Sequence, residues 1–183
     1  VGADKGIFKN GYETGVATMA FPTDLSELLT ASTSGGRNYV GSITVALNQG
    51  TSADNDGFAV VTHGVLRDTI RLGNPGFNGA ICGTGKVSVS GTLDGRLTIG
   101  SLTDIYVLDN IRYENRNPAS SNDMLGLVAN NNVIIADNEA NKHHCEIDGS
   151  IFARTGSLTA ENYNKDDPRG VLSILGSIVQ KSR

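Results

Sequence analysis

The chain contains Ile147-Asp148-Gly149-Ser150-Ile151 and repeats this pattern one interval later as Ile174-Leu175-Gly176-Ser177-Ile178. A third copy, Leu93-Asp94-Gly95-Arg96-Leu97, precedes the first by twice that interval. A fixed period of this kind is typical of repeat folds, in which each repeat buries its apolar side chains only by stacking on its neighbours. The repetition therefore predicts a β-solenoid, resembling a parallel β-helix, with three short strands in each coil.

Aliphatic residues at equivalent places in the coils are expected to lie over one another. The first strands of four successive coils begin near positions 87, 105, 133 and 158. The first and shortest interval suits a bare triangular coil, and the two longer ones that follow leave room for surface loops. The glycines at 91, 95, 149 and 176 are expected at corners of the coil. Neighbours in each column should be about 4.8 Å apart, and the expected columns are Val87/Ile105/Val133/Leu158, Leu93/Ile111/Ile147/Ile174 and Leu97/Leu125/Ile151/Ile178.

The apolar pattern divides the chain into a flank and a single β domain. From residue 38 onward apolar residues alternate with a period of two, so residues 38–183 are expected to form the solenoid. Residues 1–37 form the N-terminal flank, with one short helix at 24–31. Asp24 is placed to cap this helix, and Glu27, three residues later, completes a capping box. The predicted fold class is all-β with one short flanking helix.

Composition excludes several classes of protein. The 183 residues are 38% hydrophobic, include 23 glycines and carry a net charge of −4. No run reaches the roughly 18–20 apolar residues of a membrane span, and the charge balance is unlike that of a dedicated nucleic-acid binder. The carboxyl end follows directly on a strand, so we expect truncation there or a partner that covers the free coil edge.

The two cysteines are expected to be free and mostly buried. Cys82 precedes the first regular coil and Cys145 lies in the third, so their separation is expected to be on the order of 14 Å. A disulfide bridges Cα atoms no more than about 7 Å apart.

Four segments resemble a family of proteins. They are built of strand and corner residues and contain no catalytic signature: residues 121–136, 85–91, 145–153 and 170–181. They resemble a bacterial surface β-solenoid domain found in type IV pilus-linked, minor-pilin-like proteins. The resemblance covers about residues 83–183, with a weaker match at 21–31.

This resemblance implies an extracellular module at the cell surface of a bacterium. Its partner would be a pilus or envelope protein, and its work would be adhesion, display or DNA uptake in competence. The chain has neither the apolar amino-terminal helix of a pilin nor a surplus of basic residues.

Two groups of residues have metal-ligand chemistry. Asp54 and Asp56 lie two apart before a glycine, like the opening of a calcium loop, and a solvated turn is the competing interpretation. His144 and Glu146 are expected to share one face of a strand while Cys145 between them turns inward. The competing interpretation there is a polar loop that ends in a buried cysteine. Calcium is the one cofactor considered.

Candidate binding residues lie in the second half of the chain. Arg112, Arg116 and Arg154 could form a basic stripe, and Tyr113 is an aromatic residue beside them that could stack on a sugar or a base. A polysaccharide or DNA is the ligand that such residues would suit. Recognition on a rigid repeat scaffold usually resides in loops, and the long loops here are 114–123, 136–144 and 162–170.

An enzyme is the main alternative function. Stacked-coil folds host enzymes that cleave polysaccharides with clustered carboxylates, and Asp104 and Asp109, with Arg96 and Arg112, are the candidates. Their spacing matches no motif, and corner aspartates commonly bond to nearby backbone. We therefore expect a non-catalytic module that binds through its inserted loops.

Overall fold

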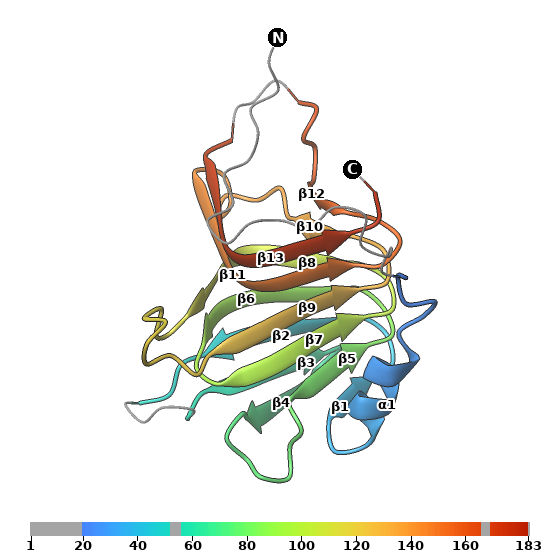
Figure 1. The fold of residues 1–183 in the computed structure, drawn as a ribbon, viewed down its shortest axis with the longest axis vertical. Helices are drawn as coiled ribbons and strands as arrows, with labels where there is room; N and C mark the ends of the chain where they lie inside the picture. The colour runs from blue at the N-terminus through green and yellow to red at the C-terminus, as the bar shows by residue number, and fades with distance from the viewer. Residues whose placement is uncertain (1–19, 52–55, 166–168, 183) are drawn as a thin grey trace.

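The computed structural model of the chain describes residues 20–51, 56–165 and 169–182. These residues form thirteen strands in one sheet and one short helix, so the predicted all-β class with one flanking helix is confirmed. The sheet curls, because three of its strands bend at mid-length and each half pairs with a different set of neighbours. Figure 1 shows β13, β11, β9, β7 and β5 stacked in front, with β8, β6 and β2 behind them.

One ladder of parallel strands contains the first predicted column. Val87 pairs with Ile105, Ile105 with Val133, and Val133 with Leu158, as expected. Ile43 extends the column by one further step, because it pairs with Val87. The ladder consists of β2 (Ile43–Asn48), the first part of β6 (Val87–Leu93), the first part of β8 (Ile105–Tyr113), β10 (Val133–Ile135) and β12 (Leu158–Ala160).

A second ladder joins the later parts of β6 and β8 to the first parts of β11 (His144–Ala153) and β13 (Val171–Gln180). Ile147 pairs with both Ile111 and Ile174, so the repeat of 147–151 at 174–178 is confirmed as direct parallel pairing. The expected place of Leu93 is wrong. A register shift in β6 sets Gly91 against Ile111 and moves Leu93 to Tyr113, because the bend of β6 takes up two residues fewer than the bend of β8.

The third ladder runs through β1 (Arg37–Tyr39), β5 (Ala80–Gly83), β7 (Arg96–Ser101), β9 (Met124–Ala129) and the later parts of β11 and β13. Leu97 pairs with Leu125 and Ile151 with Ile178, as predicted. Ile151 lies opposite Leu127, however, and not Leu125. The two-residue offset keeps both leucines on the inner face, since side chains alternate between the faces of a strand.

The core lies between the three ladders. Val89, Ile105, Ile111, Leu127 and Ile147 are all fully buried there. Burial of this apolar surface, at roughly 25 cal/mol per Å², is the main stabilising term.

The three short strands expected in each coil are in places replaced by single bent strands. Residues 105–108 and 111–113 are both in β8, 145–147 and 151–153 in β11, and 172–174 and 178–180 in β13. The chain turns at Gly149 and Gly176 with positive φ, so neither strand is interrupted at its corner. All four predicted corner glycines have positive φ.

The amino-terminal part of the described chain differs in detail from expectation. Helix α1 (Ser26–Thr33) begins two residues later than predicted, and its N-cap residue, Leu25, makes no side-chain capping bond. Asp24 instead accepts a hydrogen bond from the backbone of Ser26 at 2.9 Å, and no capping box with Glu27 forms. The helix packs at the end of the third ladder, where Leu28 lies against Gly100.

A hairpin interrupts the parallel arrangement. β3 (Phe58–His63) and β4 (Leu66–Arg71) pair antiparallel with each other, and β3 pairs antiparallel with β2. The alternation expected from residue 38 onward suits strands here, but the antiparallel direction of pairing depends on the short turn between β3 and β4.

Both cysteines are free and buried, as predicted. Burial raises the pKa of Cys82, and it raises the pKa of Cys145 to about 11. Both thiols therefore stay protonated at neutral pH.

Candidate functional site

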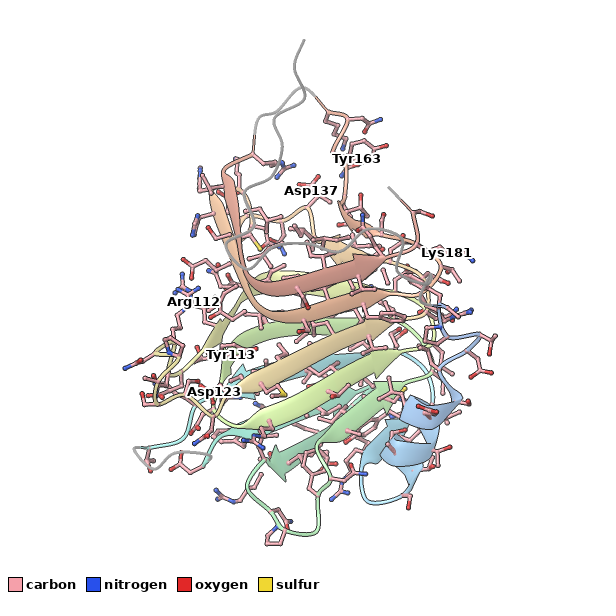
Figure 2. All side chains as sticks on the ribbon, viewed as in Figure 1. Arg112, Tyr113, Asp123, Asp137, Tyr163 and Lys181 are labelled. Carbon is pink, nitrogen blue, oxygen red and sulfur yellow. The ribbon has the colours of Figure 1, made fainter. Side chains whose placement is uncertain are left out.

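Five of the predicted site residues lie, together with Asp148, at one end of the second ladder: Arg112, Tyr113, Arg116, His144 and Glu146. We call Arg112, Arg116, His144, Glu146 and Asp148 the charged corner; Tyr113 lies beside it. Figure 2 shows Arg112, Tyr113 and Asp123 at the same edge of the sheet, on or next to the loop at 114–123.

The charges of this corner neutralise one another. Arg112 Nε donates to Glu146 Oε2 at 2.6 Å, and Arg116 Nη1 lies 3.3 Å from the same oxygen. Arg116 Nη2 donates to Asp148 Oδ1 at 2.7 Å. At Arg112 and Arg116, the basic stripe considered for a polysaccharide or DNA is therefore paired with carboxylates of the neighbouring strand.

His144 and Glu146 share a face, and Cys145 turns inward, as predicted. His144 Nε2 lies 2.9 Å from Glu146 Oε1. The hydrogen bond from His144, followed by that from Arg112, lowers the pKa of Glu146. Both oxygens of Glu146 are thus engaged, Oε1 by His144 and Oε2 by Arg112 and Arg116.

The remaining predicted metal ligands are Asp54 and Asp56. Asp54 lies outside the described residues. Asp56 Oδ2 accepts hydrogen bonds from the backbone and hydroxyl of Thr51, each at 3.1 Å. Within the described part of the chain, no group of three or more metal-ligand side chains is close enough to hold an ion.

Two other predicted binding residues have structural partners. The hydroxyl of Tyr113 accepts a hydrogen bond from the backbone N–H of Leu125 at 3.1 Å. Arg154 does not extend the stripe formed by Arg112 and Arg116, because it follows the opposite end of β11. It donates to Asn130 Oδ1 at 2.7 Å and to the carbonyl of Thr23.

The carboxylates considered for catalysis do not converge. Asp104 Oδ1 accepts from the backbone and side chain of Asn132, at 2.9 and 3.0 Å. Asp109, at the other end of the same strand segment, accepts from Asn110. These bonds fix corners of the chain.

A second site, which the sequence did not single out residue by residue, lies at the end of the molecule formed by β12 and β13. A cavity of about 140 Å³ opens there between two of the predicted binding loops. We call this cavity the terminal pocket. Its walls are mostly apolar, with polar side chains among them, and include Ile135, Cys145, Ala160, Leu172, Asn141 and Arg169.

Asn141 gives the terminal pocket its distinctive chemistry. Its side chain is only 7% exposed, and its Nδ2 donates to the carbonyls of Val107 at 2.9 Å and Ala136 at 3.1 Å. These two bonds fix the orientation of the amide, because the reverse assignment would set an oxygen against two carbonyl oxygens. Its Oδ1 is buried and accepts no hydrogen bond from the described residues.

Asp137 organises the rim of the terminal pocket (Figure 2). Its carboxylate accepts from Asn162 and pairs with Arg169, and its backbone N–H donates to Glu161 Oε2 at 2.9 Å. The hydrogen bond from Asn162, followed by that from Arg169, lowers the pKa of Asp137. Asn162 and Arg169 are therefore both tied to Asp137 at the opening.

No family model, curated protein or solved structure matches the chain. Within the described residues, no helix has the length and apolar character needed to cross a membrane.

The sequence signal for the terminal pocket was its loop composition. Asn138, Asn141 and Asn162 lie in segments that were expected to bind ligand, but asparagine is also the ordinary residue of surface turns. Only the fold shows that one of the three is buried with an unused acceptor.

Proposed function

We propose that this chain is a non-catalytic binding module, built on a short β-solenoid, that holds its ligand in the terminal pocket. The solenoid part is supported by three parallel ladders whose strands succeed one another along the chain. In the first ladder each step from β6 onward joins one strand to the equivalent strand of the next coil, and β11 and β13 pass from the second ladder to the third without a break.

The unused Oδ1 of Asn141 carries the binding part of the proposal. A buried acceptor that lacks a partner costs about 1–3 kcal/mol, and the residue that carries it, Asn141, is among those that line the terminal pocket. A hydroxyl or amine donor from a ligand would satisfy it. A single ordered water, with no ligand at all, is the alternative that the experiment must exclude.

Size and lining favour one sugar ring as the ligand. An engineered cavity of about 150 Å³ holds a molecule the size of benzene, so the terminal pocket admits one ring. The apolar faces of Ile135 and Ala160 suit the C–H face of a sugar, and Asn141 and Glu161 offer acceptors for its hydroxyls. The terminal residue of a polysaccharide is thus the ligand class we propose.

The chemistry of the terminal pocket supports binding over catalysis. Asp137 is held by Arg169 and Asn162, and the raised pKa of Cys145, about 11, keeps that thiol protonated. Such groups recognise a ligand but provide neither a free carboxylate pair nor a thiolate. A pilus-linked or envelope setting at a bacterial surface is part of the proposal and rests on the sequence resemblance.

A glycan array probed with the labelled full chain tests the proposal, followed by NMR titration with the best monosaccharide. Ala160→Leu fills the terminal pocket, and we expect it to reduce binding at least about tenfold. Ala119→Leu, in the exposed loop at 114–123, is the matched control and should bind like the parent. Binding that survives Ala160→Leu, or an array without any hit, would show that the terminal pocket is not a sugar site.

A further inference from the structure

Within the described strands, β13 is an edge of the sheet. Among the described residues it pairs with β11 on one side and with no strand on the other. β13 pairs with β11 residue by residue along its whole length. Several residues of β13 are nevertheless exposed although the β11 residues opposite them are buried. Five large apolar side chains are 42–63% exposed, namely Val171, Leu172, Leu175, Ile178 and Val179.

The sequence of β13 lacks the features that usually protect an edge strand against pairing. Natural edge strands are kept apart by shortness, lysine, proline, bulges or inward-pointing charges. β13 has ten residues, Val171–Gln180, and contains neither a charged residue nor a proline. An edge of this kind is a template for another strand.

We propose that β13 pairs with β13 of a second copy of the chain, antiparallel, with Gly176 opposite Gly176. The strand is bent at Gly176, which has positive φ, so a two-fold axis through the corner lays each arm on the other arm of the second copy. In this register Ile174 lies opposite Ile178 and Leu172 opposite Gln180. Residues that face inward in one copy therefore meet residues that face inward in the other.

Charge and area both fit a second copy. Because β13 is uncharged, two copies can approach without repulsion along the strand. A ten-residue strand is about 33 Å long, and a band that includes side chains on both faces covers on the order of 600 Å² of each copy. That is somewhat less than the roughly 800 Å² per partner of a standard interface, so we expect a reversible dimer with Kd on the order of micromolar.

Residues 1–19 of the same chain are the competing occupant. They lead to Phe21, whose ring stacks on Phe152 at a centroid distance of 5.5 Å, and Phe152 is the neighbour of Val179 on β13. That segment has no copy of the aliphatic–x–Gly–Ser–aliphatic pattern, whereas a second β13 supplies it in register. The second copy is therefore the better fit.

Sedimentation velocity on the full chain over a range of concentrations tests the proposal. The register sets Leu175 opposite Ser177 of the second copy. Leu175→Lys combined with Ser177→Lys clusters four lysines around the axis, and we expect it to weaken the dimer at least about tenfold. Leu175→Glu combined with Ser177→Lys pairs opposite charges across the axis and should keep the dimer near parental strength.

Circular dichroism and melting temperatures must first show that both double variants fold like the parent. A chain that stays monomeric at all concentrations overturns the proposal, and slow amide exchange along β13 in that monomer would assign the cover to residues 1–19. Equal behaviour of the two double variants also overturns it, because the charge pairing depends on the two-fold register.

Discussion

At the scale of single residues, the two arginines of the charged corner have different importance. Arg116 pairs with Asp148, whose side chain is 0% exposed, and Asp148 also accepts the backbone N–H of Tyr113 at 2.9 Å. Arg112 pairs with Glu146, a carboxylate that retains some exposure and has other partners. Removing Arg116 therefore leaves a buried charge with less compensation than removing Arg112 does.

We predict that Arg116→Ala lowers the free energy of unfolding by about 2–3 kcal/mol. This value lies below the cost of breaking a fully buried pair, since Arg116 is 43% exposed. Arg112→Ala should cost about 0.2–1 kcal/mol, as an exposed ion pair does. Urea denaturation of both variants measures the difference, and equal losses would contradict this account of Asp148.

The lowered pKa of Glu146 predicts a dependence of stability on pH. A carboxyl whose pKa is lower in the folded than in the unfolded state stabilises the fold above its unfolded pKa, near 4.5, and loses this effect as the pH falls through its folded pKa. Glu146→Gln should therefore be less stable than the parent at neutral pH. The gap should close as the pH falls below about 4, which thermal melts from pH 3 to 7 measure; a constant gap would rule out the ionised carboxylate as its source.

At the scale of elements, glycines allow strands to turn between ladders. Gly91 has a φ of 113°, and a Cβ at this position would lie 2.2 Å from the carbonyl oxygen of Leu47. Gly126, in the middle of β9, has no positive φ, and the nearest atom to a Cβ there is 3.5 Å away. The first glycine is required by the bend of β6, and the second is not required by its own strand.

We predict that Gly91→Ala lowers the free energy of unfolding by more than about 2 kcal/mol, through backbone strain and the contact with Leu47. Gly126→Ala, the matched control, should change it by less than about 1 kcal/mol in either direction. Urea midpoints measure both. If Gly91→Ala were as stable as the parent, β6 could bend without a positive φ at residue 91.

At the scale of the whole molecule, burial falls from the middle of the ladders to their open end. Ile147 is fully buried between Ile111 and Ile174, while Ile174, in the last strand, is only partly buried. The two residues have the same identity and equivalent backbone positions. Only their place in the stack differs.

We predict that Ile147→Ala costs about 3–4 kcal/mol, within the range for a buried isoleucine. Ile174→Ala should cost less than half as much when measured in dilute solution by urea denaturation. Equal losses in dilute solution would indicate that β13 is already covered there. At high protein concentration the cost of Ile174→Ala should rise, because the proposed dimer buries Ile174.

The sequence predicted much of this fold because repetition is a local property. The spacing of Val87, Ile105 and Val133 is readable from the chain, and the structure places them in one column. The sequence could not predict the pairing partners of Leu93 and Ile151, because these depend on how many residues each strand uses in its bend. The antiparallel direction of β3 likewise depends on its pairing partners.

In the candidate sites, too, the sequence predicted contacts within one strand but not contacts between strands that are far apart along the chain. The pairing of His144 with Glu146 follows from alternation along a strand, so the sequence predicted that they share a face. That Arg112 and Arg116 would be neutralised by carboxylates of β11 depends on parallel neighbours that are far away along the chain. The sequence grouped Arg154 with Arg112 and Arg116. β11 turns at Gly149, however, so Arg154 lies at the opposite end of this strand from the charged corner.

By itself, then, the sequence determined the all-β class, the repeat that pairs β11 with β13, the corner glycines and the two free thiols, since each follows from the order of apolar, polar and glycine residues along the chain. Only the tertiary structure decided that Asn141 keeps a buried acceptor beside a cavity and that β13 has no cover among the described strands. Both depend on which groups remain without partners after all the others have paired.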